Sequence, residues 1–99
     1  MTAELTPGQV RRLRALGHGL RPKVSVGRAG LSEPVRRSLE EAFHTSELVK
    51  ARLERSCELD RDEVGRLLAE AAEAHLVQVL GRTVLLYRPD GESPKIQLP

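Results

Sequence analysis

The fold is decided by residues 24–32, VSVGRAGLS, where an alternating apolar pair runs into two spaced glycines and then into a helix start. Val24 and Val26 lie on one side of an extended segment, and Ser32 is a residue type favoured at helix N-caps. The stretch therefore predicts a strand over residues 23–26, a GxxG loop over residues 27–30, and a helix that begins after Ser32.

Upstream, the sequence predicts a helix over residues 7–16. Thr6 and Pro7 are typical of an N-cap and a first helical position, and apolar residues follow at helical spacing at positions 10, 13 and 16. Gly17 is expected to end this helix, and Pro22 leads the chain into the strand.

The helix after Ser32 and the next strand follow from two different periodicities. Val35, Leu39, Ala42 and Phe43 form the apolar stripe of the helix. Arg36 with Glu40, and Arg37 with Glu41, are expected to pair one turn apart on its outer side. Residues 48–53 then alternate as a strand, with Lys50 and Arg52 facing away from Val49, Ala51 and Leu53.

The last third predicts a helix, a hairpin and an extended tail. Asp60 and Glu63 resemble a capping box, and apolar spacing continues the helix to about His75. Residues 76–80 and 83–88 are two strands joined by Gly81-Arg82, which suits a type II′ turn. In the tail, Ile96 and Leu98 are expected to pin the end of the chain.

This order predicts one α/β domain over residues 1–99, with its core at about residues 5–89 and an extended tail over 90–99. Helices between strands imply parallel pairing and the hairpin implies antiparallel pairing, so we expect a four-stranded mixed sheet. The helices should pack mainly on one face. The other face would then gather Lys23, Ser25, Lys50 and Arg52.

Charge is distributed unevenly along the chain. Residues 1–53 hold ten Lys or Arg against five Glu, whereas residues 54–80 hold three Arg against seven acidic residues. This pattern favours a basic surface that meets a polyanion, although charges that only keep the domain in solution are the alternative.

Other features narrow the class of protein. The single cysteine, Cys57, is expected to be a bystander thiol in a loop of a cytoplasmic protein, and no leader or membrane span is expected. The three histidines are far apart and are expected at helix ends, so we expect neither a metal nor another cofactor. No catalytic constellation or small-molecule site stands out, and we expect a protein that is not an enzyme.

A strand, a GxxG loop and a helix start can together bind phosphate. The glycines allow a left-handed backbone, so the amides of Arg28, Ala29 and Gly30 can converge on an anion near the positive end of the helix. The loop lacks the GK[ST] of a Walker loop and the spacing of a dinucleotide loop. Glu33 favours grazing contact with a sugar–phosphate backbone over burial of a nucleotide, and a plain turn is the alternative reading.

Several ordered segments resemble the CRM domain family (chloroplast RNA splicing and ribosome maturation), in particular its stand-alone bacterial YhbY-type members. They are LGHGLRP at the exit of the first helix, VGRAGLSEPV, ELVKARL and VQVLGRTVLLYRP, within a likeness over about residues 5–89. The chain departs from the family pattern at Ala29, where many relatives carry a polar residue. Residues 54–75 match mainly through their helical pattern.

The resemblance implies a fold similar to the C-terminal domain of translation initiation factor 3 and an RNA-binding function. It implies association with ribosomal RNA in large-subunit precursors, assistance to ribosome assembly, and a KH-like GxxG loop at Gly27, Arg28, Ala29 and Gly30. The alternative is a protein-interaction module that binds through the acidic helix and the final hairpin, with only incidental RNA contact.

The candidate RNA contacts are mainly basic side chains. Arg28 is the leading candidate because a loop-tip arginine has little to pack against, and Lys23, Lys50 and Arg52 follow as phosphate contacts on the sheet. Arg36, Arg37 and Arg12 complete the set, although pairing or solvation explains them equally well. Phe43 is expected in the core, and Tyr87 is expected to be structural or to stack on a base. Two aromatic residues cannot form a paired stacking platform for bases, so we expect recognition mainly of phosphate, sugar and RNA shape. We expect a monomer.

Overall fold

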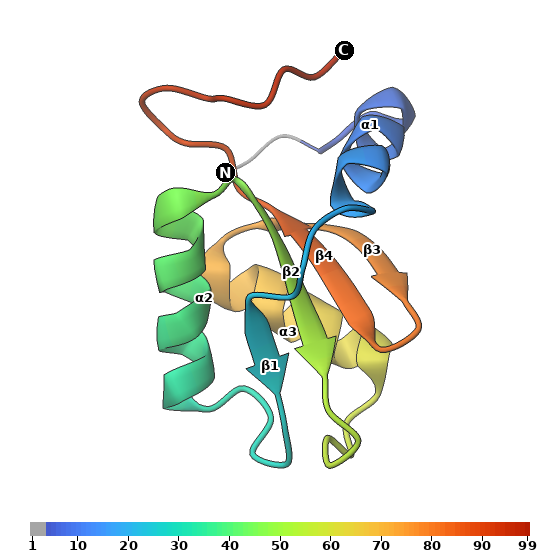
Figure 1. Cartoon of the computed structure of the whole chain (residues 1–99), viewed down its shortest axis with the longest axis vertical. Helices are drawn as coiled ribbons and strands as arrows, with labels where there is room; N and C mark the ends of the chain where they lie inside the picture. Colours follow the sequence, from blue (N-terminus) through green and yellow to red (C-terminus); the bar gives the residue numbers. More distant parts are fainter. Residues whose placement is uncertain (1–3) are drawn as a thin grey trace.

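The computed structural model describes residues 4–99 and contains seven elements in the predicted order (Figure 1). They are α1 (Pro7–Gly17), β1 (Val24–Val26), α2 (Glu33–Thr45), β2 (Leu48–Leu53), α3 (Arg61–Ala72), β3 (His75–Leu80) and β4 (Thr83–Tyr87). The strands form one sheet in the order β1-β2-β4-β3. β1 runs parallel to β2 and the other pairs are antiparallel, which confirms the α/β class and the mixed sheet.

Local capping explains where the helices begin. The Thr6 side chain accepts a hydrogen bond from the Gln9 amide while the Gln9 side chain accepts one from the Thr6 amide, a full capping box. Ser32 caps α2, as expected, and Asp60 accepts from two amides of α3. Each predicted helix start is therefore confirmed.

One predicted helix end, that of α3, is wrong, and α1 ends at Gly17, one residue beyond the predicted range. α3 ends at Ala72, because Glu73 adopts a left-handed conformation with φ of 52°, and His75 opens β3 instead of ending the helix. Gly17 belongs to α1 and is buried: a Cβ added there would lie 2.6 Å from Leu85 Cδ2. Glycine at this position lets the helix approach the sheet closely, and no neighbouring residue in the sequence indicates this contact.

Two hydrophobic cores lie on opposite faces of the sheet. α2 and α3 cover one face and bury Val26, Leu39, Val49, Leu68 and Leu86, so the helices pack mainly on one face, as predicted. α1 is the exception: its Leu13 packs on the other face, and the members of that second core are Leu13, Leu48, Val77, Leu85 and Tyr87.

The hairpin and the tail match their predictions. Gly81 has φ of 58° and Arg82 is not left-handed, as a type II′ turn requires. Ile96 and Leu98 pack against the second core. The tail is also held by Glu47, whose buried carboxylate accepts hydrogen bonds from three tail amides, those of Asp90 (2.6 Å), Lys95 (2.8 Å) and Ile96 (2.7 Å).

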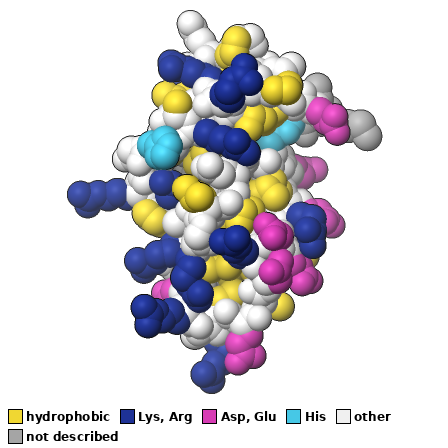
Figure 2. Space-filling view, turned by 90° about the vertical axis from the view of Figure 1, so that its right-hand side faces the viewer, with side chains coloured by type: hydrophobic (Ala, Val, Ile, Leu, Met, Phe, Trp, Pro, Cys, Tyr) yellow, Lys and Arg dark blue, Asp and Glu magenta, His cyan; other side chains and the backbone are white. Residues whose placement is uncertain are grey.

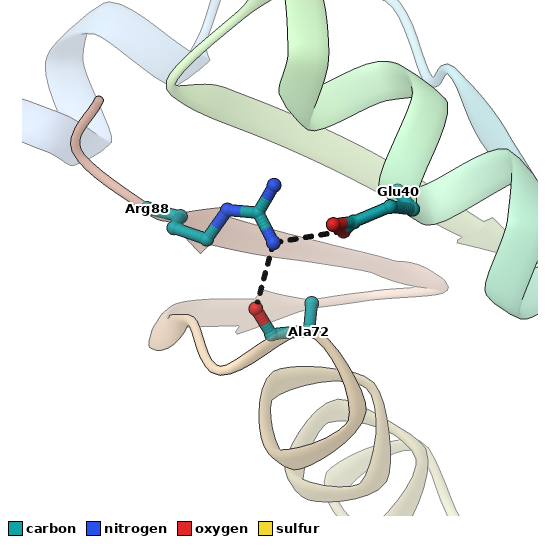
Figure 3. Close-up of polar contacts among 3 residues, drawn as sticks. All are labelled: Glu40, Ala72 and Arg88. Atoms are coloured by element: carbon teal, nitrogen blue, oxygen red, sulfur yellow. Dashed lines mark hydrogen bonds and ion pairs between the residues drawn. The ribbon is translucent and has the colours of Figure 1, made fainter. Parts of the chain in front are cut away.

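One arginine joins the helices to the sheet on the first face. Arg88, directly after β4, donates from Nη1 to Glu40 Oε2 of α2 at 2.8 Å and to the Ala72 carbonyl of α3 at 3.0 Å (Figure 3). Its guanidinium also lies 4.7 Å from the centre of the Phe43 ring. Within residues 4–99 this is the only ion pair, so the predicted pairing of Arg36 with Glu40 is wrong, as is that of Arg37 with Glu41.

Phe43 is buried in the first core, as predicted. Cys57 lies in the β2–α3 loop, as predicted, and the structure adds that its free thiol is buried in the first core. No helix in the part of the chain that the structure describes is long and apolar enough to cross a membrane.

Candidate nucleic-acid interface

The GxxG loop is a tight turn with an exposed tip. The Gly30 amide donates to the Gly27 carbonyl at 3.0 Å, and Gly30 has φ of 63°. The expectation that three amides converge on an anion is therefore wrong for Gly30, because its N–H closes the turn. Arg28 and Ala29 are exposed, so the loop can offer an anion the Arg28 side chain and the amides of the two tip residues.

The start of α2 adds little more to this site. The Ser32 hydroxyl accepts from the Val35 amide at 3.4 Å and so satisfies one of the unpaired N–H groups of the first turn. Glu33 is exposed in that same turn and adds a negative charge. This geometry suits contact at the loop tip rather than deep anion burial.

The basic sheet face forms as the alternation predicts. The Lys23 amide donates to the Lys50 carbonyl at 2.8 Å, and Ser25 is in register with Arg52, which in turn is in register with Thr83 of β4. Because Val24, Val26, Ala51 and Leu53 belong to the opposite core, the side chains between them face away from α2 and α3.

Exposure differs among the predicted contacts on this face. Lys23 and Arg52 are exposed, whereas Lys50 is half-buried. Arg12 is exposed on α1, which packs on this same face at the Leu48 end of β2. The structure therefore brings Lys23, Lys50 and Arg52 together, with Arg12 on the same side of the sheet.

Arg36 and Arg37 lie apart from these residues. Both are on α2, which covers the opposite face of the sheet. Arg36 lines a cavity between α2 and α3 together with the acidic Glu40 and Glu73, and a neighbouring one with Glu70. A single RNA strand lying across the basic sheet face would not also follow the α2–α3 groove.

Charge is segregated over the surface as well as along the sequence. Figure 2 shows Lys and Arg side chains along one side of the molecule and at its top, while most Asp and Glu gather on the other side. The acidic residues of α3, Asp62, Glu63 and Glu70, belong to the helix layer behind the sheet. One face of the protein thus carries an excess of positive charge, as a surface that binds a polyanion would.

Aromatic stacking on a base is not available from either aromatic residue. Tyr87 is 4% exposed in the second core and stacks on His75 with ring centroids 6.0 Å apart. Burial, together with the nearby Glu47 charge, raises the pKa of Tyr87. Phe43 is also buried, so neither aromatic ring is exposed for stacking on a base.

Two arginines beside this face were not among the predicted contacts. Arg82, in the β3–β4 turn, donates from Nε to the Leu53 carbonyl at 3.2 Å and from Nη2 to the Glu54 carbonyl at 2.8 Å. Arg55 is exposed in the β2–α3 loop, and both side chains line a cavity with Arg52. Only the alignment of the hairpin turn with the end of β2 brings them together, and no local sequence signal encodes it.

These features define a small α/β domain with a basic sheet face next to an exposed GxxG turn. In residues 4–99, no group of three or more His, Cys, Asp or Glu is placed to hold a metal ion. The CRS1/YhbY (CRM) domain family matches residues 5–88. The chain belongs to this family.

The relatives agree along nearly the whole chain. It is 35% identical over 95 residues to the Bacillus subtilis protein named "Probable RNA-binding protein YqeI", covering 96% of this chain and 99% of that one. It is 34% identical over 95 residues to a Haemophilus influenzae protein named "RNA-binding protein", covering 96% and 95%. The solution structure of the hypothetical protein SAV1595 from Staphylococcus aureus superposes with a TM-score of 0.82 at 32% identity, covering 97% of this chain and all of that one.

Proposed function

We propose that this protein binds RNA through the tip of its GxxG turn and its basic sheet face. The observation that carries the proposal is the placement of Arg28, Lys23, Lys50 and Arg52 along one end and face of the sheet, with acidic helix α3 behind it. Relatives that match this chain end to end are named RNA-binding proteins.

The mechanism we propose is electrostatic and has no chemical step. Exposed Lys and Arg side chains bind phosphates and release counterions, which gives affinity without reading base sequence. The rigid sheet fixes the spacing of these charges, so the protein selects RNA whose backbone follows the same path. Its partner would be ribosomal RNA in large-subunit precursors, where a cytoplasmic, monomeric protein holds one RNA conformation during assembly.

RNA binding is tested by a salt series with a labelled RNA stem-loop that carries a single-stranded tail. The logarithm of affinity should fall with the logarithm of salt concentration, with a slope of about −0.7 for each single-strand phosphate contact. Arg28→Glu should weaken binding. Arg66→Glu, at an exposed position of α3, is the matched control and should leave binding unchanged. Equal affinity of both variants and wild type would remove the loop from the interface.

The ribosomal role needs a separate measurement in cells. We expect the tagged protein to sediment with precursors of the large subunit at low salt and to leave them at high salt. Crosslinking followed by RNA sequencing should then recover large-subunit ribosomal RNA. Recovery of other RNA classes alone would retain RNA binding and reject the ribosomal assignment.

A second function, binding of a protein partner with incidental RNA contact, is favoured by edge strand β3. Its sequence HLVQVL has no acidic or Lys/Arg residue, and Leu76 and Leu80 are 37% and 57% exposed. If this function is the main one, Leu80→Lys would release a co-purifying protein and leave RNA affinity unchanged.

A further inference from the structure

The end of the sheet beside the GxxG turn carries a second basic feature. An open cavity of about 320 Å³ lies between the end of β2, the β2–α3 loop and the hairpin turn. It is lined by Arg52, Leu53, Glu54, Arg55 and Arg82. We infer that this groove, called here the arginine groove, binds an RNA phosphate adjacent to the one at the GxxG turn, an inference that rests on the proposed function.

None of the three arginines of the groove forms an ion pair within residues 4–99, and the single carboxylate among the lining residues is that of Glu54. The Glu40–Arg88 bridge is the single ion pair found across residues 4–99, so no carboxylate there lies within 4.0 Å of the guanidinium of Arg52, Arg55 or Arg82. Three like charges around one cavity repel each other unless an anion lies between them. The groove is therefore suited to a ligand that supplies negative charge.

Arg82 is pre-oriented for that ligand. Its bonds to the carbonyls of Leu53 and Glu54 use two of the five guanidinium N–H donors. Both acceptors are neutral, so the positive charge of Arg82 is not paired by them. Arg82 itself lines the cavity, and the two bonds hold its guanidinium in place, so binding a phosphate through the remaining donors costs little side-chain entropy. Arg55 is exposed and can close over the bound group.

The groove is also adjacent to the GxxG turn. A Cβ added at Gly27 would lie 3.3 Å from both Glu54 Oε2 and Ser56 Oγ, so the β2–α3 loop touches the first glycine of the turn. The Glu54 carboxylate thus lies toward the turn, while its carbonyl holds Arg82. An RNA backbone at Arg28 that continues along this end of the sheet reaches the arginine groove next.

The test compares Arg55→Gln with the matched variant Arg66→Gln, using the same tailed stem-loop RNA. Among residues 4–99 the Arg55 side chain has no hydrogen-bond partner, whereas the Arg82 side chain bonds to Leu53 and Glu54, so Arg55 is the variant of choice. We expect Arg55→Gln to weaken binding about threefold or more and to reduce the salt slope by about 0.7, with no change for Arg66→Gln. The Arg82 Nε–H resonance should also shift when RNA is added to wild type.

The outcomes separate this inference from the proposed function. If wild type binds RNA and Arg28→Glu weakens binding, but Arg55→Gln behaves like Arg66→Gln and the Arg82 resonance does not move, the arginine groove is overturned and RNA binding stands. If wild type binds no RNA at low salt, both proposals are wrong.

Discussion

At the residue scale, the two glycines of the GxxG turn are glycine for different reasons. Gly30 is left-handed, and an added Cβ would lie 3.1 Å from Leu59 Cδ1. Gly27 is not left-handed, and its neighbours are the flexible ends of Glu54 and Ser56. Gly30 is therefore needed for its backbone conformation, whereas Gly27 is needed for the close approach of the β2–α3 loop.

Gly30→Ala should accordingly destabilise the fold by about 1–2 kcal/mol, because an L-residue is strained in the left-handed region. Gly27→Ala should cost less than about 1 kcal/mol, because side-chain ends can shift. Urea unfolding followed by circular dichroism gives both values, and a larger loss for Gly27→Ala would contradict the assignment.

Arg88 is a basic residue that stabilises the fold through contacts within the protein. Arg88→Ala removes the bonds to Glu40 and to the Ala72 carbonyl and the contact with Phe43, and should lower the free energy of unfolding by about 1–3 kcal/mol. Arg66→Ala on α3 is the control and should change it by less than about 0.5 kcal/mol. RNA affinity of the folded Arg88→Ala protein should match wild type, since Arg88 lies on the helix-covered face.

At the element scale, α1 docks on the sheet through a residue without a side chain. Gly17 is the last residue of α1, so Gly17→Ala improves helix propensity by at most about 1 kcal/mol, and it places a methyl group 2.6 Å from the buried Leu85 side chain. We expect the clash to prevail, with a net loss of about 1–2 kcal/mol. A thermal melt tests this, with Ala15→Gly on the exposed side of α1 as the comparison: stabilisation by Gly17→Ala would show that α1 can shift.

Elements were predictable wherever their signals are local. Thr6, Ser32 and Asp60 mark helix starts through bonds to amides two or three residues away, so the sequence alone places them. The end of α3 was missed because Glu73 adopts a left-handed conformation without the usual glycine, and the alanine-rich stretch before it favours helix.

The candidate site was likewise predictable only where its residues are arranged by local periodicity. Alternation alone puts Lys50 and Arg52 on one face, because strand periodicity is local. It cannot say that α2 carries Arg36 to the other side, nor that Arg82 lies beside Leu53, 29 residues earlier. Those placements depend on how elements pack, which one sequence does not encode in any short stretch.

At the scale of the whole molecule, Glu47 joins the tail to the body. Burial opposes ionisation of its carboxyl, but the amides of Asp90, Ile96 and Lys95 outweigh burial and lower its pKa below the usual 4.5. A group whose pKa is lowered by folding stabilises the protein fully above its unfolded pKa. That contribution is lost as the pH falls through the lower, folded-state value.

Glu47→Gln should therefore be less stable than wild type at neutral pH, and the difference should shrink as the pH falls below about 4.5. Urea unfolding across this pH range measures the difference, and amide exchange of residues 90–96 should rise in the variant. Glu41→Gln, at an exposed position of α2, controls for loss of one charge. A difference that does not depend on pH would mean that the carboxylate charge is not what holds the tail.

The tail and α1 meet at the end of the molecule away from the GxxG turn (Figure 1). The Gln9 side chain donates to the Pro99 carbonyl at 3.2 Å, and Leu5 and Leu98 both contact the second core. Polypeptide added after Pro99 would thus emerge at the end of the molecule away from the GxxG turn. A second domain attached there would leave the proposed RNA-binding surface exposed, and a circular permutant that joins Pro99 to Leu5 should need only a short linker.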